Sequence, residues 1–338
     1  MPNNVGNAPK KQLVFSATVA RTFDDPDDFA ATIPGGAYGV MPIGAEAFES
    51  TVRMTNLGGG VSARSIGFSN SVLIRAEFVS DPDYPTIAFL LPCIRGNQAL
   101  LNGREVSGNY VSSSSDGALH QFRTQGAHEV GTITTAQEVL LEAHDTLVGG
   151  RVPTYLKGEA VIRTNPSLVH RLNALHRRAG ELLRLHSPED LNAHAAAGLG
   201  LLRSTVLAAL VETITAGSGK PDHLATRRQT ASMARIDRYI DDHPGDTFSL
   251  QDLCRESGMA LRTMETIVRN RTGMTAFEYL RRRRLAFVRK ALLTADPGTT
   301  ITQVALSHGF LHLGRFSIEY RRAFGESPSA TLARATGG

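Results

Sequence analysis

The sequence predicts an α+β fold in which a small β-barrel and a helical segment precede a separate all-α domain. Three observations predict this order. Short segments of alternating polarity, separated by turn-forming pairs, occupy residues 12–134. Helical periodicity replaces them from Thr135 onward, and two stretches after residue 250 repeat each other at an offset of about fifty residues. The length of 338 residues suits two domains joined by a linker.

The first part of the chain is expected to form the barrel. Its clearest strand-like segments are residues 48–54, 72–78, 86–91 and 128–134. Turn signals interrupt them, and Asn102-Gly103 is the strongest hairpin signal among these. The segments are too short and too regularly interrupted for buried helices, so a barrel or sandwich is the best interpretation.

Long apolar helices are predicted between the barrel and the second domain. Leucines recur at helical spacing over residues 168–185 and again, with valines, over residues 201–211. Apolar helices outside a compact sheet often pair between subunits, which predicts a homodimer. The boundaries that follow are an effector-binding and dimerisation domain at 12–216, a linker at 217–229 and an all-α domain at 230–334.

Charge and composition restrict the partners. From Arg227 to the end there are 18 Lys+Arg against 11 Asp+Glu, whereas the remainder of the chain carries a net charge of −3. Only the second domain is therefore expected to face a polyanion. No run of 18 apolar residues and no secretory segment is evident, so a cytoplasmic location without membrane contact is expected. The two cysteines, Cys93 and Cys254, predict neither a disulfide framework nor a thiolate metal cage.

The duplicated stretches each read as two helices separated by a tight turn. The turn glycines Gly258 and Gly309 lie 51 residues apart, whereas Gly273 and Gly325, at the ends of the second helices, lie 52 apart. The second turn therefore has one extra residue. Each second helix has an apolar pair at i, i+4 that packs back on the first: Met264 and Val268, Phe316 and Tyr320. This pattern is typical of a helix-turn-helix.

A continuous helix is predicted between the two units, over residues 279–293. A rigid helix here would fix the separation of the two second helices. For adjacent major grooves on one face of a duplex that separation is about 34 Å. Together with the basic charge, this predicts a bipartite reader of double-stranded DNA.

The residues resemble the AraC/XylS family of transcription regulators. The motifs that carry the resemblance are residues 258–264, Arg284-Leu285, Gly309-Phe310, residues 315–317 and residues 324–328. Through these motifs the resemblance implies the base-reading positions Arg262, Glu265 and Thr266 in the first unit and Arg315, Ser317 and Ile318 in the second. Family members usually have Ser as the N-cap of each recognition helix, and Ala260 and Gly314 are expected to stand there in this chain.

Chemistry distinguishes the base-reading positions from the remaining basic residues. Arg262 and Arg315 have the geometry to fork onto guanine, whereas Ile318 is suited to contact a thymine methyl group or to pack. The other arginines are expected to contact phosphate: Arg269, Arg281, Arg282, Arg283, Arg321 and Arg322.

The resemblance further implies a cupin-like barrel that binds a small-molecule effector, with promoter DNA and RNA polymerase as partners. It favours an activator, although the residues themselves are equally compatible with a repressor. XylS-like relatives sense small aromatic acids. The alternative is a cyclic dinucleotide, because residues 53–60 weakly resemble a motif of PilZ-type cyclic di-GMP binders. The candidate effector residues on this hypothesis are Arg53, Asn56, Arg64 and Arg75.

Enzymatic function is not expected. Pro92-Cys93-Ile94-Arg95 resembles the Pro-Cys-His-Arg motif of alkyl-transferring DNA repair proteins, but the histidine that would activate the thiol is missing. The histidines are scattered and include no His-x-His pair, so no metal site is expected. No nucleotide-binding loop or hydrolase elbow is evident, and neither a catalytic residue nor a cofactor is predicted. A constitutive architectural DNA binder remains a third hypothesis.

Overall fold

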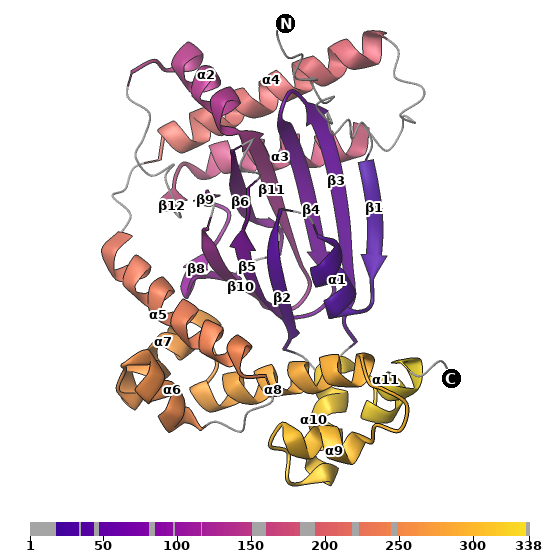
Figure 1. Ribbon diagram of the computed structural model, residues 1–338. Coiled ribbons are helices and arrows are strands. Elements are labelled where there is room, and N and C mark those ends of the chain that lie inside the picture. Colours follow the sequence, from indigo (N-terminus) through magenta and orange to yellow (C-terminus); the bar gives the residue numbers. More distant parts are fainter. Residues whose placement is uncertain are drawn as a thin grey trace, which may run out of the picture.

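The computed structural model describes residues 18–33, 35–43, 47–80, 85–96, 99–115, 117–150, 160–182, 193–217, 223–244 and 249–335. In Figure 1 the β-rich N-terminal part lies above a helical C-terminal part. This arrangement confirms the predicted α+β order.

The N-terminal domain contains two antiparallel sheets. Within the described residues, one has the strand order β1-β3-β4-β11-β6-β9-β12 and the other the order β2-β5-β10-β7-β8. The strands of the first are β1 (Thr18–Phe23), β3 (Ser50–Gly58), β4 (Val61–Phe68), β6 (Thr86–Arg95), β9 (Tyr110–Ser114), β11 (His128–Ala136) and β12 (Ala160–Arg163). Those of the second are β2 (Gly36–Pro42), β5 (Val72–Phe78), β7 (Ala99–Leu101), β8 (Arg104–Val106) and β10 (Leu119–Thr124).

The predicted hairpin at Asn102-Gly103 is confirmed and joins β7 to β8. Asn102 has φ +52°, the left-handed conformation that a two-residue hairpin turn needs. The expected barrel is correct as a β-rich domain, but the described strands form two separate sheets and do not close on each other.

Two apolar cores flank the larger sheet. Phenylalanines dominate the core between the sheets, where Phe29 meets Phe23, Phe48 and Phe68 at ring-centroid distances of 5.5 to 6.0 Å. Aliphatic side chains from the opposite face of the larger sheet form the second core with α2 (Gln137–Leu147), α3 (Pro166–Leu182) and α4 (Ala193–Thr215). The short helix α1 (Pro26–Thr32) contributes Phe29 to the first core.

Helix α4 is apolar on nearly every face. Its segment Ala197–Thr215 is long and apolar enough to cross a membrane by length and composition. Such a test is also met by core helices of soluble proteins, and Val206, Leu210 and Val211 of α4 are fully buried in the domain core. Leu201 on the same helix is 71% exposed.

The C-terminal domain is helical throughout its described residues, as predicted. Its helices are α5 (His223–Asp242), α6 (Leu250–Ser257), α7 (Leu261–Thr272), α8 (Ala276–Leu293), α9 (Ile301–Ser307), α10 (Leu313–Phe324) and α11 (Pro328–Ala335). Helix α8 is the predicted connecting helix. Helix α5 begins inside the predicted linker 217–229, of which residues 218–222 lie outside the described residues.

The two domains contact each other closely, with α8 lying across the end of the sheets (Figure 1). Arg75 of β5 pairs with Asp237 and Asp241 of α5, both at 3.2 Å. Arg289 of α8 binds Asp25, the N-cap of α1, and Asp27 in the first turn of α1. The C-terminal domain is therefore attached by ion pairs through both α5 and α8.

Candidate nucleic-acid interface

Each helix-turn-helix unit is built by local sequence. In the first, Ser249 and Asp252 form a capping box at the start of α6, and Gly258 ends that helix with φ +66°. In the second, Thr300 and Gln303 form the equivalent box at α9, and Gly309 has φ +81°. Glycine enters this left-handed conformation without steric cost, so both turns are specified by the sequence.

The two recognition helices are equivalent in length and register. Helices α7 and α10 each have 12 residues, begin at Leu261 and Leu313, and end on left-handed Gly273 and Gly325. Every residue of α7 therefore corresponds to the residue of α10 that lies 52 positions later.

This register corrects one expectation about the helix caps. Ala260 is the N-cap of α7 as predicted, but the N-cap of α10 is His312, and Gly314 lies two residues inside the helix. Neither N-cap side chain makes a capping hydrogen bond. Both recognition helices therefore begin without a capping hydrogen bond from a side chain.

In the first unit, the exposed face of α7 presents Arg262 and Thr266 one turn apart. The Thr266 hydroxyl donates to the carbonyl of Arg262 at 2.8 Å. Glu265 is directed elsewhere, since its carboxylate accepts a hydrogen bond from the backbone N–H of Ala276 at 3.2 Å. Glu265 thus joins α7 to the start of α8, although it was predicted to read a base.

In the second unit, Arg315 is held in place by a carboxylate. Its side chain is 69% exposed, and its Nε donates to Glu319 at 2.8 Å. Glu319 also accepts from Nε of Arg281 on α8 at 2.5 Å. Burial alone would raise the pKa of Glu319, but hydrogen bonds from Arg281 and Arg315 outweigh it and lower that pKa. An ionised Glu319 therefore orients the side chain of Arg315. The two terminal nitrogens of Arg315 stay available for a bidentate contact with a base.

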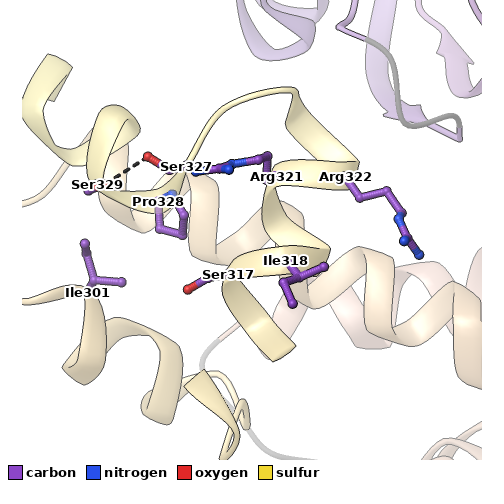
Figure 2. Close-up of a pocket in the computed structure, with 8 residues that line it drawn as sticks. All are labelled: Ile301, Ser317, Ile318, Arg321, Arg322, Ser327, Pro328 and Ser329. Carbon is purple, nitrogen blue, oxygen red and sulfur yellow. Dashed lines mark hydrogen bonds between the residues drawn. The ribbon is translucent and has the colours of Figure 1, made fainter. Parts of the chain in front are cut away.

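Ser317 and Ile318 line an open groove of about 660 Å³ beside α10 (Figure 2). Its other walls come from α9 and the start of α11, and the lining residues are Ile301, Ser317, Ile318, Arg321, Arg322, Ser327, Pro328 and Ser329.

The internal repeat explains why this groove exists in the second unit. Glu265 and Ala276, which hydrogen-bond in the first unit, correspond to Ser317 and Pro328. Serine is too short to make the same contact, and proline has no N–H to donate. The contact that joins the helices in the first unit therefore cannot form in the second.

Three of the predicted phosphate-contacting arginines are exposed: Arg269, Arg321 and Arg322. Figure 2 shows Arg321 extending towards Ser327, whereas Arg322 extends away from the groove. Their positions suit contacts with the DNA backbone on either side of a recognition helix.

The arginine run at the start of α8 is engaged within the protein. Arg282 donates to the carbonyls of Pro42 and Ile43 at 2.7 and 2.9 Å, and Arg283, which is 7% exposed, pairs with Asp241. Arg281 pairs with Glu319. The expectation that Arg281, Arg282 and Arg283 contact phosphate does not fit this conformation, in which they bind protein oxygens.

The predicted effector residues do not form one site. In the β3–β4 pairing Arg53 lies opposite Ser65 and Arg64 lies opposite Met54, so the two arginines project from opposite faces of the sheet. Asn56 accepts from the N–H of Gly58 within the β3–β4 turn. Arg75 forms an ion pair with Asp237 in the contact between the two domains. The side chain of Cys93, which carried the alkyl-transfer hypothesis, lies outside the described residues.

Some functional contacts were not anticipated from the sequence. Glu319 was not singled out, although its i, i+4 spacing from Arg315 is a signal that could have found it. The partners of Arg282 and Arg283 could not be found that way, because Arg282 binds residues about 240 positions earlier in the chain and Arg283 binds across from α8 to α5.

Comparisons with known proteins point to the same part of the chain. Residues 253–334 match a family model described as a helix-turn-helix domain. Over 102 residues the chain is 41% identical to XylDLEGF operon transcriptional activator 2 of Pseudomonas putida, covering 29% of this chain and 64% of that protein. It is 38% identical over 104 residues to the XylDLEGF operon transcriptional activator of the same organism, covering 30% and 32%.

Among solved structures, the chain is similar to the AraC-like transcriptional activator CuxR. The similarity extends over 80% of this chain and 94% of that one, with 17% sequence identity and a TM-score of 0.41. The sequence matches to the two Pseudomonas putida activators cover less than two thirds of the length of those proteins.

Proposed function

We propose that this chain is a transcription regulator of the AraC/XylS family that recognises a specific promoter sequence, because residues 253–334 match a helix-turn-helix family model. The observation that supports this most directly is the pair of recognition helices. They share one register, expose Arg262 and Arg315, and are joined by the single helix α8. A second helix exposed in this way enters the major groove in helix-turn-helix proteins.

Selection of binding sites from a randomised duplex library tests this proposal. The full chain is expected to enrich one sequence. Arg262→Ala and Arg315→Ala should each relax base preference at a defined position, because a bidentate arginine–guanine contact contributes about 1 to 3 kcal/mol of discrimination. Failure to enrich any sequence would contradict the proposal.

Arg321→Ala provides the matched control. Its side chain is exposed on the same helix as Arg315 but is assigned to the backbone. Its loss should weaken specific and random duplexes alike and reduce the salt dependence of binding by about one phosphate contact. Equal losses on specific and random DNA in all three variants would remove the distinction between base and phosphate contacts.

We further propose that a small molecule bound by the N-terminal domain controls DNA binding, and that the regulator is an activator that contacts RNA polymerase. The named relatives are transcriptional activators, which supports the second point. An aromatic acid is the preferred effector class. The separation of Arg53, Asn56, Arg64 and Arg75 removes the argument for a cyclic dinucleotide site built from these four residues.

Thermal unfolding of the full chain tests the effector proposal. A ligand that binds only the folded state should raise the melting temperature progressively with its concentration. Aromatic acids, sugars and cyclic dinucleotides form the test set. No shift with any aromatic acid would contradict the preferred class, and a shift with a cyclic dinucleotide alone would restore the alternative.

Homodimerisation is proposed to involve α4. Leu201 is 71% exposed on this otherwise apolar helix, and large exposed apolar side chains are common at subunit interfaces. Leu201→Lys should shift a dimer towards monomer in light scattering, whereas Glu212→Lys, farther along the same helix at an ion pair with Arg171, should leave the mass unchanged.

A further inference from the structure

The two recognition helices present different chemistry at equivalent positions. In the 52-residue register, Arg262 of α7 corresponds to Gly314 of α10, and Thr266 corresponds to Ile318. The first helix therefore has a cation one turn before a hydroxyl-bearing residue. The second has a bare backbone one turn before an aliphatic side chain.

Ile318 is exposed to a degree that the fold does not explain. Its side chain is 64% exposed, although the apolar residues Phe316 and Tyr320 of the same helix are fully buried in the domain core. It forms part of the groove wall between Ser317 and Arg321, as Figure 2 shows. Exposure of this apolar side chain to water is unfavourable. Contact with an apolar group that covers the side chain would be favourable.

Gly314 is likewise not required by the fold. A Cβ atom built there would meet nothing within 4 Å, and its φ is not in the left-handed region. Glycine inside a helix is less favourable than alanine. What glycine provides at this exposed site is close approach of the helix backbone to an outside partner.

The arginines around Ile318 favour a polyanionic partner. The exposed isoleucine itself favours a partner that also carries an apolar group at its surface. Arg315, Arg321 and Arg322 are exposed on α10 around Ile318. In the major groove of DNA, the 5-methyl group of thymine is the apolar group that a side chain can reach between two lines of phosphates.

We propose that Ile318 reads the 5-methyl group of a thymine, and that Gly314 lets α10 approach the base edges closely enough for this contact. The proposal rests on the DNA-reading function proposed above. On this proposal the two units are chemically distinct. The first reads a hydrogen-bonding base edge through Arg262. The second reads a thymine methyl group through Ile318 and a further base through Arg315.

Removal of the methyl group from the DNA tests the contact directly. The duplex enriched by the full chain is remade with deoxyuridine in place of each thymine in turn, within the half-site whose selection changes in Arg315→Ala. One such replacement is expected to weaken binding of the wild type about four-fold, the equivalent of one buried methyl group. The same replacement should have no effect on Ile318→Ala, because the two changes remove the same contact.

Leu306→Ala is the matched control, because it removes a 44% exposed apolar side chain from α9 of the same unit. It should keep the full sensitivity to deoxyuridine. Equal sensitivity in Ile318→Ala and the wild type would overturn the proposal, as would no sensitivity at any thymine. A selected half-site without thymine would overturn it while leaving the DNA-reading function intact, whereas no enriched sequence at all would contradict that function.

Gly314→Ala tests the role of close approach separately. Alanine has the higher helix propensity, so the variant should melt at a higher temperature than the wild type. Its affinity for the selected duplex should nevertheless fall. Affinity equal to or above that of the wild type would overturn the role assigned to Gly314.

Discussion

At the scale of single residues, Arg289 is a buried cation in the domain contact. Its side chain is 3% exposed and donates to Asp25, to Asp27 at 3.2 Å and to Glu326 at 2.8 Å. Burial alone would raise the pKa of the Asp25 carboxyl, but Arg289 and the N–H groups of Asp27 and Asp28 outweigh it and lower that pKa. One guanidinium thus neutralises carboxylates from both domains.

Replacement of this arginine should be costly. Arg289→Met keeps the aliphatic packing but leaves three carboxylates close together without their buried cation, and we expect the free energy of unfolding to fall by about 3 kcal/mol. Chemical denaturation measures this. Arg334→Met is the control, because Arg334 is 49% exposed and binds Glu326 at 2.9 Å and Asp25 at 3.5 Å. An exposed pair of this kind should contribute less than about 1 kcal/mol. Equal losses in the two variants would show that burial is not what makes Arg289 important.

At the scale of secondary structure, the recognition helices are the uncapped helices of their units. Helices α6 and α9 have complete capping boxes, whereas Ala260 and His312 make no capping bond. Ala260 already has the extended backbone that an N-cap residue requires, with φ −67° and ψ 148°.

A serine at position 260 should therefore supply the missing acceptor. We expect Ala260→Ser to raise the free energy of unfolding by about 1 kcal/mol, and Thr300→Ala to lower it by a similar amount through loss of an existing cap. Thermal or chemical unfolding of the full chain compares them. A destabilised Ala260→Ser would mean that the start of α7 is not limited by capping.

The elements that could be predicted from the sequence are those with local signals. The glycine-ended helices, the connecting helix and the Asn102-Gly103 hairpin all follow from periodicity and turn chemistry. The cap of α10 was misplaced, because the extra residue of the second turn shifts the register and Gly314 resembles a cap residue in composition only. The predicted barrel or sandwich is confirmed as a β-rich domain of two sheets, but its closure could not be predicted, since alternation along a strand does not reveal which strands leave an edge open.

At the scale of the whole molecule, the N-terminal domain contacts the ends of both recognition helices. A Cβ on Gly273, after α7, would lie 1.6 Å from Arg123 Nη1, and one on Gly325, after α10, would lie 3.2 Å from the Cα of Ala47. Arg282 of α8 binds the carbonyl of Pro42 at the end of β2. Contacts between residues so distant in sequence have no local signature, which is why the arginine run was interpreted as a phosphate-binding surface.

Because these contacts and the single helix α8 join the two helix-turn-helix units, we expect the units to move as one rigid body. A rigid reader of this kind is expected to require two DNA half-sites about one helical turn apart, roughly 34 Å. A rigid reader can engage both half-sites only at that separation and on one face of the duplex.

A spacing series on the selected duplex tests this most directly. Insertion of about 5 base pairs between the half-sites turns them to opposite faces, and insertion of about 10 restores the face but doubles the distance. We expect both insertions to reduce the affinity of the full chain to that of a duplex with one half-site. Retention of full affinity with either insertion would contradict it, because the two units would then move independently.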